Sequence, residues 1–423
     1  MTPESLSQWL EYIERIHPKS IDMGLDRIAR VRDALGLALA VPTIVVGGTN
    51  GKGSACAYIA AILGAAGYGV GLYTSPHLLR YNERVTVNGR EASDEQLIAA
   101  FERVERGRGE TQLTYFEFGT LAAWDIFASA RLDCLVLEVG MGGRLDAVNA
   151  LDADCAVLTS IGLDHMEYLG GTREAIGREK AGIFRSGRPA VLADVDPPAS
   201  VIEHACTIGA DLLVLGRDFG YRDRGGQWDY WGPTAGRRGL AHPSMQGRGQ
   251  LANASGALAA LGALRGRLPV ATRDVRSGLA GADLPGRFQV LPGRPVVVLD
   301  VAHNPDAARM LAGNLGDMGF FEETYAVIGM LRDKDIAGVA SALKDRVTHW
   351  CCASLPGARG AEASVLARAV QESGAGGDVS LYDSPASAFA QAKSRAREND
   401  RIVVFGSFLT VAEISAGRCA PRR

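Results

Sequence analysis

A glycine-rich segment that joins a β-branched run to a helical run limits the possible folds of this chain more than any other part of it. Thr43-Ile-Val-Val-Gly47 is followed by Gly48-Thr-Asn-Gly-Lys-Gly-Ser54 and then by the alanine-rich residues 55–66. A strand that leads through glycines into a helix points successive backbone N–H groups at one place, where a phosphate can bind at the helix N-terminus. The segment therefore predicts an α/β fold with a phosphate-binding loop after an early strand.

The residue types in this loop fit a nucleoside triphosphate. Lys52 can neutralise the charge of β- and γ-phosphates, and the Ser54 hydroxyl can ligate Mg²⁺. The loop departs from a standard Walker A sequence, because its leading glycine is displaced by one residue and Gly53 separates Lys52 from Ser54. The alternative is a glycine-rich strand–helix turn without a ligand, and the placement of the lysine and the serine favours the phosphate site.

Length and composition narrow the class of protein. With 423 residues the chain exceeds what one hydrophobic core usually supports, so two domains are expected. Its 45 basic residues and 48 acidic residues leave a net charge of −3, which argues against binding nucleic acid or an anionic membrane through bulk charge. Seven scattered cysteines without a Cys-x-x-Cys pair, no signal sequence and no apolar run of bilayer length predict a cytoplasmic protein.

The pattern of strands and helices predicts where the two domains divide. Apolar strands alternate with helices in the first part of the chain, which is typical of a parallel sheet covered on both faces. Two Pro-Gly pairs at 285–286 and 292–293 suggest a hinge, after which the alternation starts again and continues to Phe405. We therefore predict a P-loop-type parallel-sheet domain over residues 1–286 and a smaller Rossmann-like α/β domain over residues 287–423.

Residues 217–249 differ from the rest because arginines alternate with aromatic residues and glycines. This composition occurs on surfaces that bind single-stranded nucleic acid. Asp218, Asp223 and Asp229 dilute the positive charge, however. We therefore predict a β-hairpin or meander whose solvent face is rich in arginine.

Polar residues follow several predicted strands at the point where each strand ends. Ser75-Pro-His77, Glu138 and Asp164-His165 come after three strands of the first domain, and Asp300-Val-Ala-His-Asn304 holds the corresponding place in the second. Ligands of open α/β sheets bind at the carboxyl ends of the strands, and hard oxygen donors suit Mg²⁺. Each cluster alone could be a helix cap or a structural ion pair. Together with the phosphate loop they predict a nucleotide and metal site.

Six motifs in a fixed order resemble the folylpolyglutamate synthases, and most closely the bacterial bifunctional dihydrofolate synthase/folylpolyglutamate synthases. These enzymes are Mur-ligase-like ATP-dependent amide ligases, and the resemblance runs from about Trp9 to Phe408. The motifs are Gly-Thr-Asn-Gly-Lys-Gly-Ser at 48–54, Ser-Pro-His-Leu at 75–78, Glu-Val-Gly-Met-Gly-Gly-Arg-Leu-Asp at 138–146, Asp-His at 164–165, Arg-Glu-Lys-Ala-Gly-Ile at 178–183 and Asp-Val-Ala-His-Asn-Pro at 300–305.

The resemblance implies an enzyme that uses ATP to convert a carboxylate into an acyl phosphate, which the α-amine of L-glutamate then attacks. The expected substrates are dihydropteroate, which gives dihydrofolate, and reduced folates, which give folylpolyglutamates. It implies two Mg²⁺ sites and small-molecule substrates only, and we expect a monomer. The sequence leaves open whether dihydropteroate is used as well as folate, which one-carbon form and tail length are preferred, what the oligomeric state is, and what residues 217–249 do.

The same resemblance assigns roles to individual residues. Lys52, His165 and Lys180 would be catalytic, and Lys180 matches a family lysine that is carbamylated. The ATP site would consist of Thr49, Asn50, Gly51, Lys52, Gly53, Ser54, Asn253, Arg287, Asp300 and His303. The metal ligands would be Ser54, Ser75, Glu138, His165 and Lys180, and the pterin substrate would contact Asp22, Arg27, Thr114, Tyr115, Phe116, Glu117, Leu145 and Asp146.

Two other functions account for fewer of these features. A Mur ligase that adds an amino acid to a cell-wall precursor carries an extra N-terminal domain, and only about 40 residues precede Thr43, too few for one. Such enzymes also usually have threonine where Gly53 stands. A nucleotide-dependent switch would need neither a glutamate nor a pterin pocket, and ATP hydrolysis without amide formation would identify it.

Overall fold

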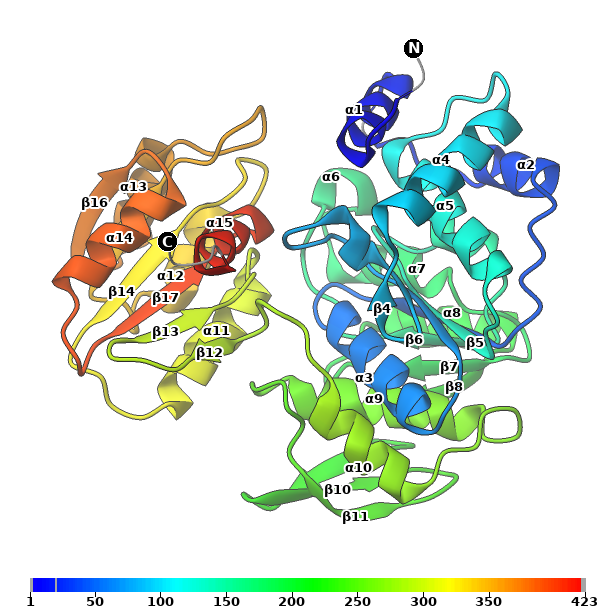
Figure 1. Ribbon diagram of the computed structural model, residues 1–423. Helices are drawn as coiled ribbons and strands as arrows, with labels where there is room; N and C mark the ends of the chain where they lie inside the picture. Colours follow the sequence, from blue (N-terminus) through cyan, green and yellow to red (C-terminus); the bar gives the residue numbers. More distant parts are fainter. Residues whose placement is uncertain (1–2, 20, 420–423) are drawn as a thin grey trace. The chain divides into compact units, whose positions relative to one another are not determined.

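The computed structural model describes residues 3–19 and 21–419, and these form two compact units (Figure 1). The first unit runs to Ser244 and includes Leu251–Ala282, and the second consists of Met245–Gln250 and the chain from Asp283 onward. Each unit is an α/β structure built on its own mostly parallel sheet, which confirms the predicted fold class.

The sheet of the first unit has eight strands in the order β4-β3-β2-β5-β1-β6-β7-β8. Its centre is parallel and buried on both faces because its strands are mostly apolar, as in Cys134-Leu-Val-Leu137 of β5. The pairing of β3 with β2 and β4 is antiparallel and adds an edge that the sequence did not predict. The strands are β1 Thr43–Gly47, β2 Val70–Tyr73, β3 Val85–Val87, β4 Arg90–Glu91, β5 Cys134–Glu138, β6 Cys155–Leu158, β7 Pro189–Leu192 and β8 Asp211–Val214.

Helices cover both faces of this sheet (Figure 1). The aromatic side chains of Trp9, Phe101, Phe118 and Trp124 are buried in the core. On another part of the unit Gly278 lets α10 approach α3 closely, because a Cβ at this position would meet the backbone of Ile62. The helices are α1 Leu6–Ile16, α2 Asp26–Ala34, α3 Lys52–Ala65, η1 Tyr81–Arg84, α4 Asp94–Arg108, α5 Tyr115–Ser129, η2 Ala147–Ala150, α6 Met166–Leu169, α7 Arg173–Ala181, α8 Ala199–Ile208, α9 Gln250–Ala263 and α10 Thr272–Gly281.

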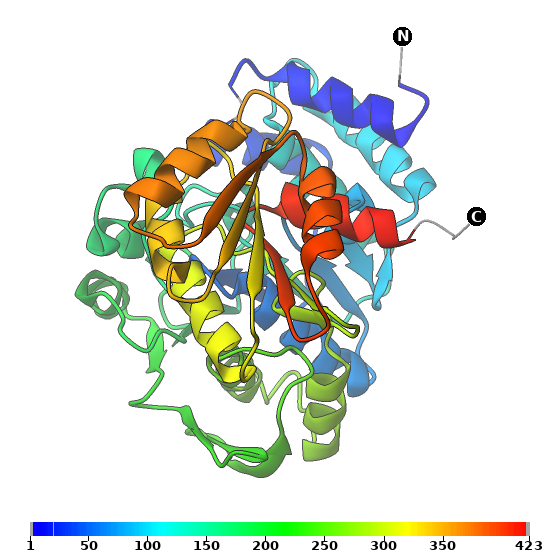
Figure 2. The same ribbon diagram turned by 90° about the vertical axis from the view of Figure 1, so that its left-hand side faces the viewer.

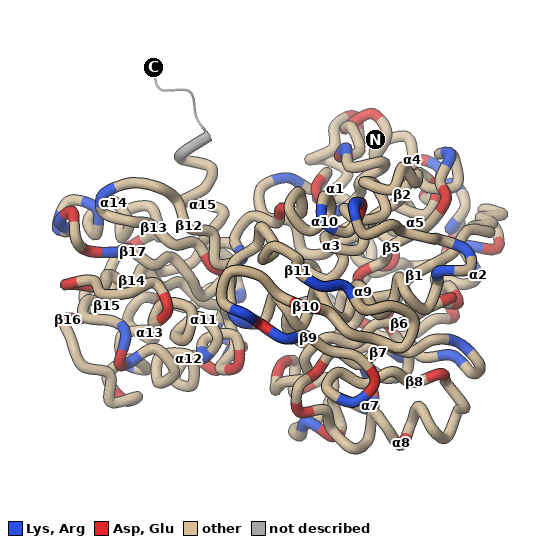
Figure 3. The backbone as a smooth tube through the Cα atoms, turned by 90° about the horizontal axis from the view of Figure 1, so that it is seen from below, with Lys and Arg blue, Asp and Glu red and all other residues tan. Residues whose placement is uncertain are grey.

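The arginine-rich segment forms a separate antiparallel sheet of β9 Gly220–Asp223, β10 Gln227–Trp231 and β11 Arg237–Ala241, in the order β11-β10-β9. This confirms the predicted meander. Trp228 and Tyr230 are buried, whereas Arg224 forms an ion pair with Asp229 at 2.7 Å. Figure 3 shows basic and acidic residues alternating along β9, so neighbouring acidic groups offset the positive charge of this segment.

The second unit has a six-stranded sheet in the order β12-β13-β17-β14-β15-β16, in which only the β12–β13 pairing is antiparallel. Helices α11, α12 and α13 lie on one face and α14 and α15 on the other (Figure 2), which confirms the predicted Rossmann-like unit. Its elements are β12 Gln289–Leu291, β13 Val296–Leu299, α11 Pro305–Asp317, β14 Thr324–Ile328, α12 Ile336–Leu343, β15 His349–Ala353, α13 Ala363–Glu372, β16 Asp378–Tyr382, α14 Pro385–Arg395, β17 Arg401–Phe405 and α15 Phe408–Cys419. Across residues 3–19 and 21–419, no helix has the length and apolar character needed to cross a membrane.

Candidate active site

The phosphate loop follows β1 and depends on glycine at two positions. Gly48 and Gly51 have φ values of 141° and 93°, which residues with a Cβ rarely adopt. A side chain at Gly48 would collide with Thr159, and one at Gly51 would collide with the amide of Asn253. Asn253, on α9, therefore lies directly against the loop. The backbone passes through Gly51 into α3, so that Lys52 begins the helix.

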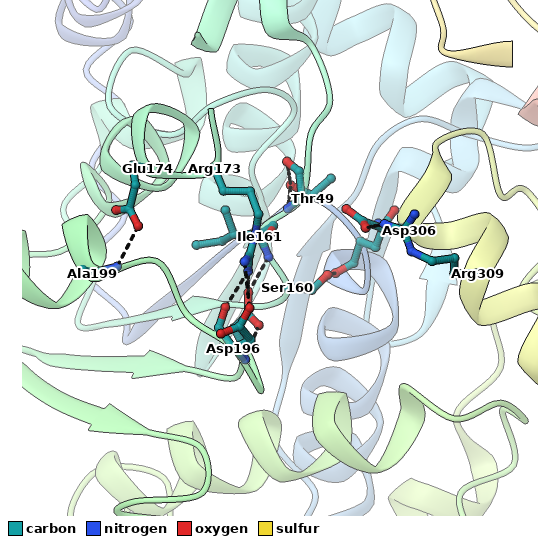
Figure 4. Close-up of polar contacts among 12 residues, drawn as sticks. Thr49, Ser160, Ile161, Arg173, Glu174, Asp196, Ala199, Asp306 and Arg309 are labelled. Atoms are coloured by element: carbon teal, nitrogen blue, oxygen red, sulfur yellow. Dashed lines mark hydrogen bonds and ion pairs between the residues drawn. The ribbon is translucent and has the colours of Figure 1, made fainter. Parts of the chain in front are cut away.

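The loop is held by the residues that follow β6. The Thr49 N–H donates to the carbonyl of Ser160 at 2.6 Å, and the Ser160 hydroxyl donates to the carbonyl of Asn50 at 3.0 Å. Arg173 supports this segment in turn, because its Nε donates to the carbonyl of Ile161 at 2.9 Å and its Nη1 pairs with Asp196 (Figure 4). The loop is thus positioned by tertiary contacts with the segment that follows β6.

Two lysines converge on one carbonyl oxygen of the loop. Lys52 Nζ donates to the Gly48 carbonyl at 3.2 Å, and Lys180 Nζ donates to the same oxygen at 2.8 Å. Lys180, near the end of α7, is buried, and burial together with the charge of Lys52 lowers its pKa to about 7. Nearby Asp164 and Asp146 oppose this shift. A substantial fraction of Lys180 is therefore a neutral amine near pH 7, as carbamate formation requires.

The candidate metal ligands lie at the same edge of the sheet. Glu138 ends β5 and is buried, and its Oε2 accepts a hydrogen bond from the Ser75 N–H at 3.0 Å. Burial raises the pKa of Cys56, and the Glu138 charge adds to this rise, which places the carboxylate close to the first turn of α3 that holds the buried Ser54. His165, with φ 51°, caps α6, and its Nε2 is 4.0 Å from Asp164 Oδ2.

These donors suit Mg²⁺ better than a transition metal. Among the side chains of residues 3–19 and 21–417, no three His, Cys, Asp or Glu are grouped closely enough to enclose a metal by themselves. Mg²⁺ is commonly held by one or two carboxylates, water and substrate phosphates. Glu138 and the serine oxygens beside a phosphate loop match that arrangement.

Four of the predicted pterin contacts form one hydrogen-bonded cluster at the start of α5. Thr114 and Glu117 cap this helix reciprocally: the Glu117 N–H donates to Thr114 Oγ1 at 3.2 Å, and the Thr114 N–H donates to Glu117 Oε2 at 2.8 Å. Arg27 pairs with Glu117 at 3.2 Å and with Asp22 at 2.7 Å. The polar groups of Thr114 and Glu117 are thus used to start the helix and orient Arg27, which leaves Asp22 and Arg27 better placed to meet a substrate.

Phe116 and Asp146 connect this cluster with the metal ligands. The Phe116 ring lies against Gly140, where a Cβ would be 2.6 Å from it, two residues after Glu138. Asp146 accepts hydrogen bonds from the N–H groups of Met141 and Val148 at 2.9 and 3.0 Å, while burial raises the pKa of its carboxyl to about 7. Leu145 is half-buried in the same segment.

The structure adds Arg84, which motif reading did not assign to the site, and gives a contact to His77, which lies in the Ser-Pro-His-Leu motif but received no individual role. Arg84 is buried with its guanidinium 5.5 Å from the centroid of the Tyr115 ring, and its Nε donates to His77 Nδ1 at 2.9 Å. Burial and the Arg84 charge lower the pKa of His77 to about 4, so that His77 is neutral at pH 7. Arg84 ends the short helix η1 directly before β3, and the sequence does not show its role because its contacts with Tyr115 and His77 join separate segments.

Three predicted nucleotide contacts come together in the second unit. Asp300 follows β13 and accepts hydrogen bonds from the N–H groups of Phe288 and Ala302 at 2.9 and 2.8 Å. Burial raises the pKa of its carboxyl, although the charge of Arg287 opposes this. His303 Nδ1 is 2.8 Å from the Val301 carbonyl. This turn is braced largely by its own backbone.

Comparison with known proteins relates this arrangement to one enzyme family. Residues 46–261 match the Mur ligase middle domain, and residues 286–408 match the Mur ligase glutamate ligase domain. The dihydrofolate synthase/folylpolyglutamate synthase of Escherichia coli K12 is 45% identical over 417 residues, which cover 98% of this chain and 96% of that protein. The chain belongs to the dihydrofolate synthase/folylpolyglutamate synthase family.

Solved structures of this family have the same fold. The structure of E. coli FolC in complex with DHPP and ADP superposes with a TM-score of 0.95 at 44% identity and covers all of both chains. A bifunctional folylpolyglutamate synthase/dihydrofolate synthase with Mn, AMPPNP and L-glutamate bound gives a TM-score of 0.91 at 43% identity, with 99% of this chain and 100% of that chain covered.

Proposed function

We propose that this protein is an ATP-dependent ligase that adds L-glutamate to dihydropteroate, giving dihydrofolate, and to reduced folates, giving folylpolyglutamates. The observation that carries the proposal is the convergence of Lys52 and Lys180 on the Gly48 carbonyl of the phosphate loop. It occurs in a chain whose full length matches a family of this activity. A simple nucleotide-binding turn has no need of a second, buried lysine.

The reaction proceeds in two steps. A substrate carboxylate oxygen attacks the γ-phosphorus of ATP, the bond to the β,γ-bridging oxygen breaks, and ADP leaves. The glutamate amine then attacks the carbon of the acyl phosphate, and the amide forms as phosphate departs and the amine loses its proton. The protein positions the reactants and neutralises phosphate charge, as in other phosphoryl transfers.

Individual residues divide this work. The loop N–H groups from Thr49 to Gly53, together with Lys52, bind the triphosphate. When bound, Mg²⁺ would supply positive charge at the transferring phosphate, and Ser54, Ser75 and Glu138 would hold it. His165, with Glu138 and a carbamylated Lys180, would hold a second ion. Asn253, Arg287, Asp300 and His303 would complete the nucleotide contacts.

The pterin substrate is assigned to the first unit. The ring of Phe116 supplies a face on which a flat pterin can stack. Asp22 and Arg27 supply polar contacts, and Tyr115, Leu145 and Asp146 lie in the segments next to them. We propose that residues 1–286 bind ATP and folate and that residues 287–423 contribute to the glutamate and nucleotide sites.

We further propose that the enzyme works as a monomer in the cytoplasm, with small molecules as its only partners. Six cysteines are free thiols, which fits a reducing compartment: Cys56, Cys134, Cys155, Cys206, Cys351 and Cys352. The pairing of Arg224 with Asp229 on the arginine-rich sheet supports the absence of a nucleic-acid partner.

A single assay tests the proposal. Purified protein is incubated with ATP, Mg²⁺, labelled L-glutamate and either dihydropteroate or tetrahydrofolate, and the products are separated by tail length. We expect dihydrofolate from the first substrate and polyglutamates from the second. Product from tetrahydrofolate alone would make the enzyme a monofunctional folylpolyglutamate synthase. ATP hydrolysis without amide formation would contradict the proposal.

A further inference from the structure

A cavity of about 270 Å³ lies in the second unit, at the end of its sheet opposite the Asp300 turn. Its walls come from the segment after α11, the segment after α12 and the first residues of β14 and β17. Because β13, β14 and β17 are parallel and Asp300 follows β13, the beginnings of these strands lie at the other edge. The cavity is therefore separate from the Asp300 turn.

The floor of the cavity contains a buried arginine with unused donors. Arg401 is only 5% exposed; its Nε donates to Thr324 Oγ1 at 2.9 Å, and its Nη1 donates to the Leu315 carbonyl. Its guanidinium carbon is 4.9 Å from the centroid of the Phe321 ring. The third nitrogen, Nη2, makes neither of these bonds and is not sealed off inside the protein. Its two N–H groups are therefore open to the cavity.

A second guanidinium lines the same cavity. Arg346 lies over Gly316, where a Cβ would be 2.9 Å from its Nη2 and 3.2 Å from its Cζ, so the glycine makes room for it. Burial, together with the charge of Arg346, lowers the pKa of Arg401 to about 10. Two cations held this close repel each other, and an anion between them would remove that cost.

The carboxylates near the two arginines leave this charge largely unbalanced. Neither Arg346 nor Arg401 has a carboxylate oxygen within 4.0 Å among the residues that the structure describes. Asp317, at the end of α11, accepts hydrogen bonds from both Nε and Nη2 of Arg248 at 2.6 Å. These bonds, and to a smaller extent the charge of Arg346, lower the pKa of Asp317, so this carboxylate offsets Arg346 only in part. The C-terminal end of α11, where carbonyl groups point outward, carries only about half a negative charge. The negative charges of the wall residues Glu322 and Asp345 are offset in part by the positive charge of Lys344.

We propose that this cavity binds a small phosphate-bearing molecule, with its phosphate between Arg401 and Arg346. A phosphate monoester carries close to two negative charges at neutral pH and three acceptor oxygens, which match two guanidiniums better than a single carboxylate does. Phe320, which is 88% exposed beside the cavity, offers an apolar surface to the group that the phosphate carries. This site is additional to the ATP site of the proposed function.

Equilibrium dialysis with radiolabelled inorganic phosphate tests the proposal on the full chain. A saturating non-hydrolysable ATP analogue with Mg²⁺ fills the phosphate loop, so that only other sites take up label. Arg346 is exposed, so Arg346→Ala should fold normally, and Arg368→Ala, an exposed arginine on α13 outside the cavity, is the matched control. We expect one phosphate per chain in the unaltered protein and in Arg368→Ala, and about tenfold weaker binding in Arg346→Ala.

Competition experiments identify the class of ligand. If the ligand is an organic phosphate, glycerol phosphate should displace the label at a lower concentration than unlabelled inorganic phosphate does. In Phe320→Ala the two compounds should then be equally potent. Equal potency would assign the site to inorganic phosphate. The proposal is overturned if no label binds once the ATP site is filled, if Arg346→Ala and Arg368→Ala bind equally, or if citrate displaces phosphate more strongly than either phosphate compound.

Discussion

The turn after β1 in the first unit and the turn after β13 in the second are both strand-to-helix connections with polar residues, yet they use these residues differently. After β1, two lysines meet at one carbonyl, and the pKa of Lys180 is lowered to about 7. After β13, the carboxylate of Asp300 accepts hydrogen bonds from two backbone N–H groups of its own unit. The first turn is built for charge that arrives with a ligand, and the second is built mainly to hold its own shape.

Replacing Lys52 should have the largest effect, because it tests the first turn directly. Lys52→Ala should lower amide formation about a hundredfold or more, since the β- and γ-phosphates lose a fixed counter-charge. Its free energy of unfolding should change by less than about 0.5 kcal/mol, because the half-buried side chain at the start of α3 is not part of the hydrophobic core. Steady-state kinetics and urea unfolding measure the two effects. Lys393→Ala, an exposed lysine on α14, is the control, and near-normal turnover in Lys52→Ala would contradict this account.

Replacing Lys180 tests whether its neutral amine matters. Lys180→Ala should lose about tenfold to a hundredfold in activity and recover part of it with added short carboxylates, which replace the carbamate oxygens. Lys180→Arg should not substitute, because a guanidinium stays charged and forms no carbamate. A fully active Lys180→Arg enzyme, or metal-bound protein with an unmodified Lys180, would show that the carbamate is not needed.

The pKa of Lys180 also predicts how activity responds to pH. Because the pKa is lowered to about 7, the neutral amine is the minor form below that pH and the major form above it. After removal of carbon dioxide at low pH, the recovery of activity with bicarbonate should therefore increase as the pH is raised through about 7. Recovery that is the same at pH 6 and pH 8 would argue against a reactive amine.

Asp300→Ala should affect stability more than Lys52→Ala does. The N–H groups of Phe288 and Ala302 would lose their acceptor, which costs about 1–3 kcal/mol in the free energy of unfolding. Urea unfolding measures this, and Asp300→Asn, which keeps an acceptor oxygen, should lose less. If Asp300→Ala unfolds like the unaltered protein, the contrast between the two turns is wrong.

Phe116→Ala should have the smallest effect. Stacking on one ring contributes about 0.5–1.5 kcal/mol beyond the buried area, so the KM for the pterin substrate should rise by up to about tenfold. The KM for ATP should stay within a few-fold. Phe116→Leu fills the space against Gly140 without an aromatic face and separates stacking from packing. Equal weakening of both substrates would indicate a folding defect.

The parts of the fold that depend on residues adjacent in the sequence were predictable from the sequence alone. The strand–loop–helix order of residues 43–66 defines the phosphate loop, since glycines and an apolar strand act locally. Aromatic residues that alternate with charged ones likewise predicted the meander within residues 217–249. The antiparallel edges formed by β3 and β12 were not predicted, because short strands carry little periodic signal of their own.

The site was predictable as a set of residues but not as a set of contacts. Lys180 reaches a carbonyl 132 positions away, and Asn253 meets Gly51 across two segments that are distant in sequence. Thr114-x-x-Glu117 has the sequence of a capping box, which could have been recognised from its residues alone. Such contacts depend on how elements pack, and a motif read along one chain does not contain that information.

The transfer of oxygen from substrate to phosphate tests the central claim, that the phosphate loop of the first unit activates a carboxylate for attack by glutamate. Dihydropteroate labelled with ¹⁸O in both carboxylate oxygens is converted in the presence of ATP, Mg²⁺ and L-glutamate, and the released phosphate is analysed by mass spectrometry. The account predicts one ¹⁸O atom in each phosphate, because the acyl C–O bond breaks when the amide forms. Unlabelled phosphate released together with normal amide formation would contradict it.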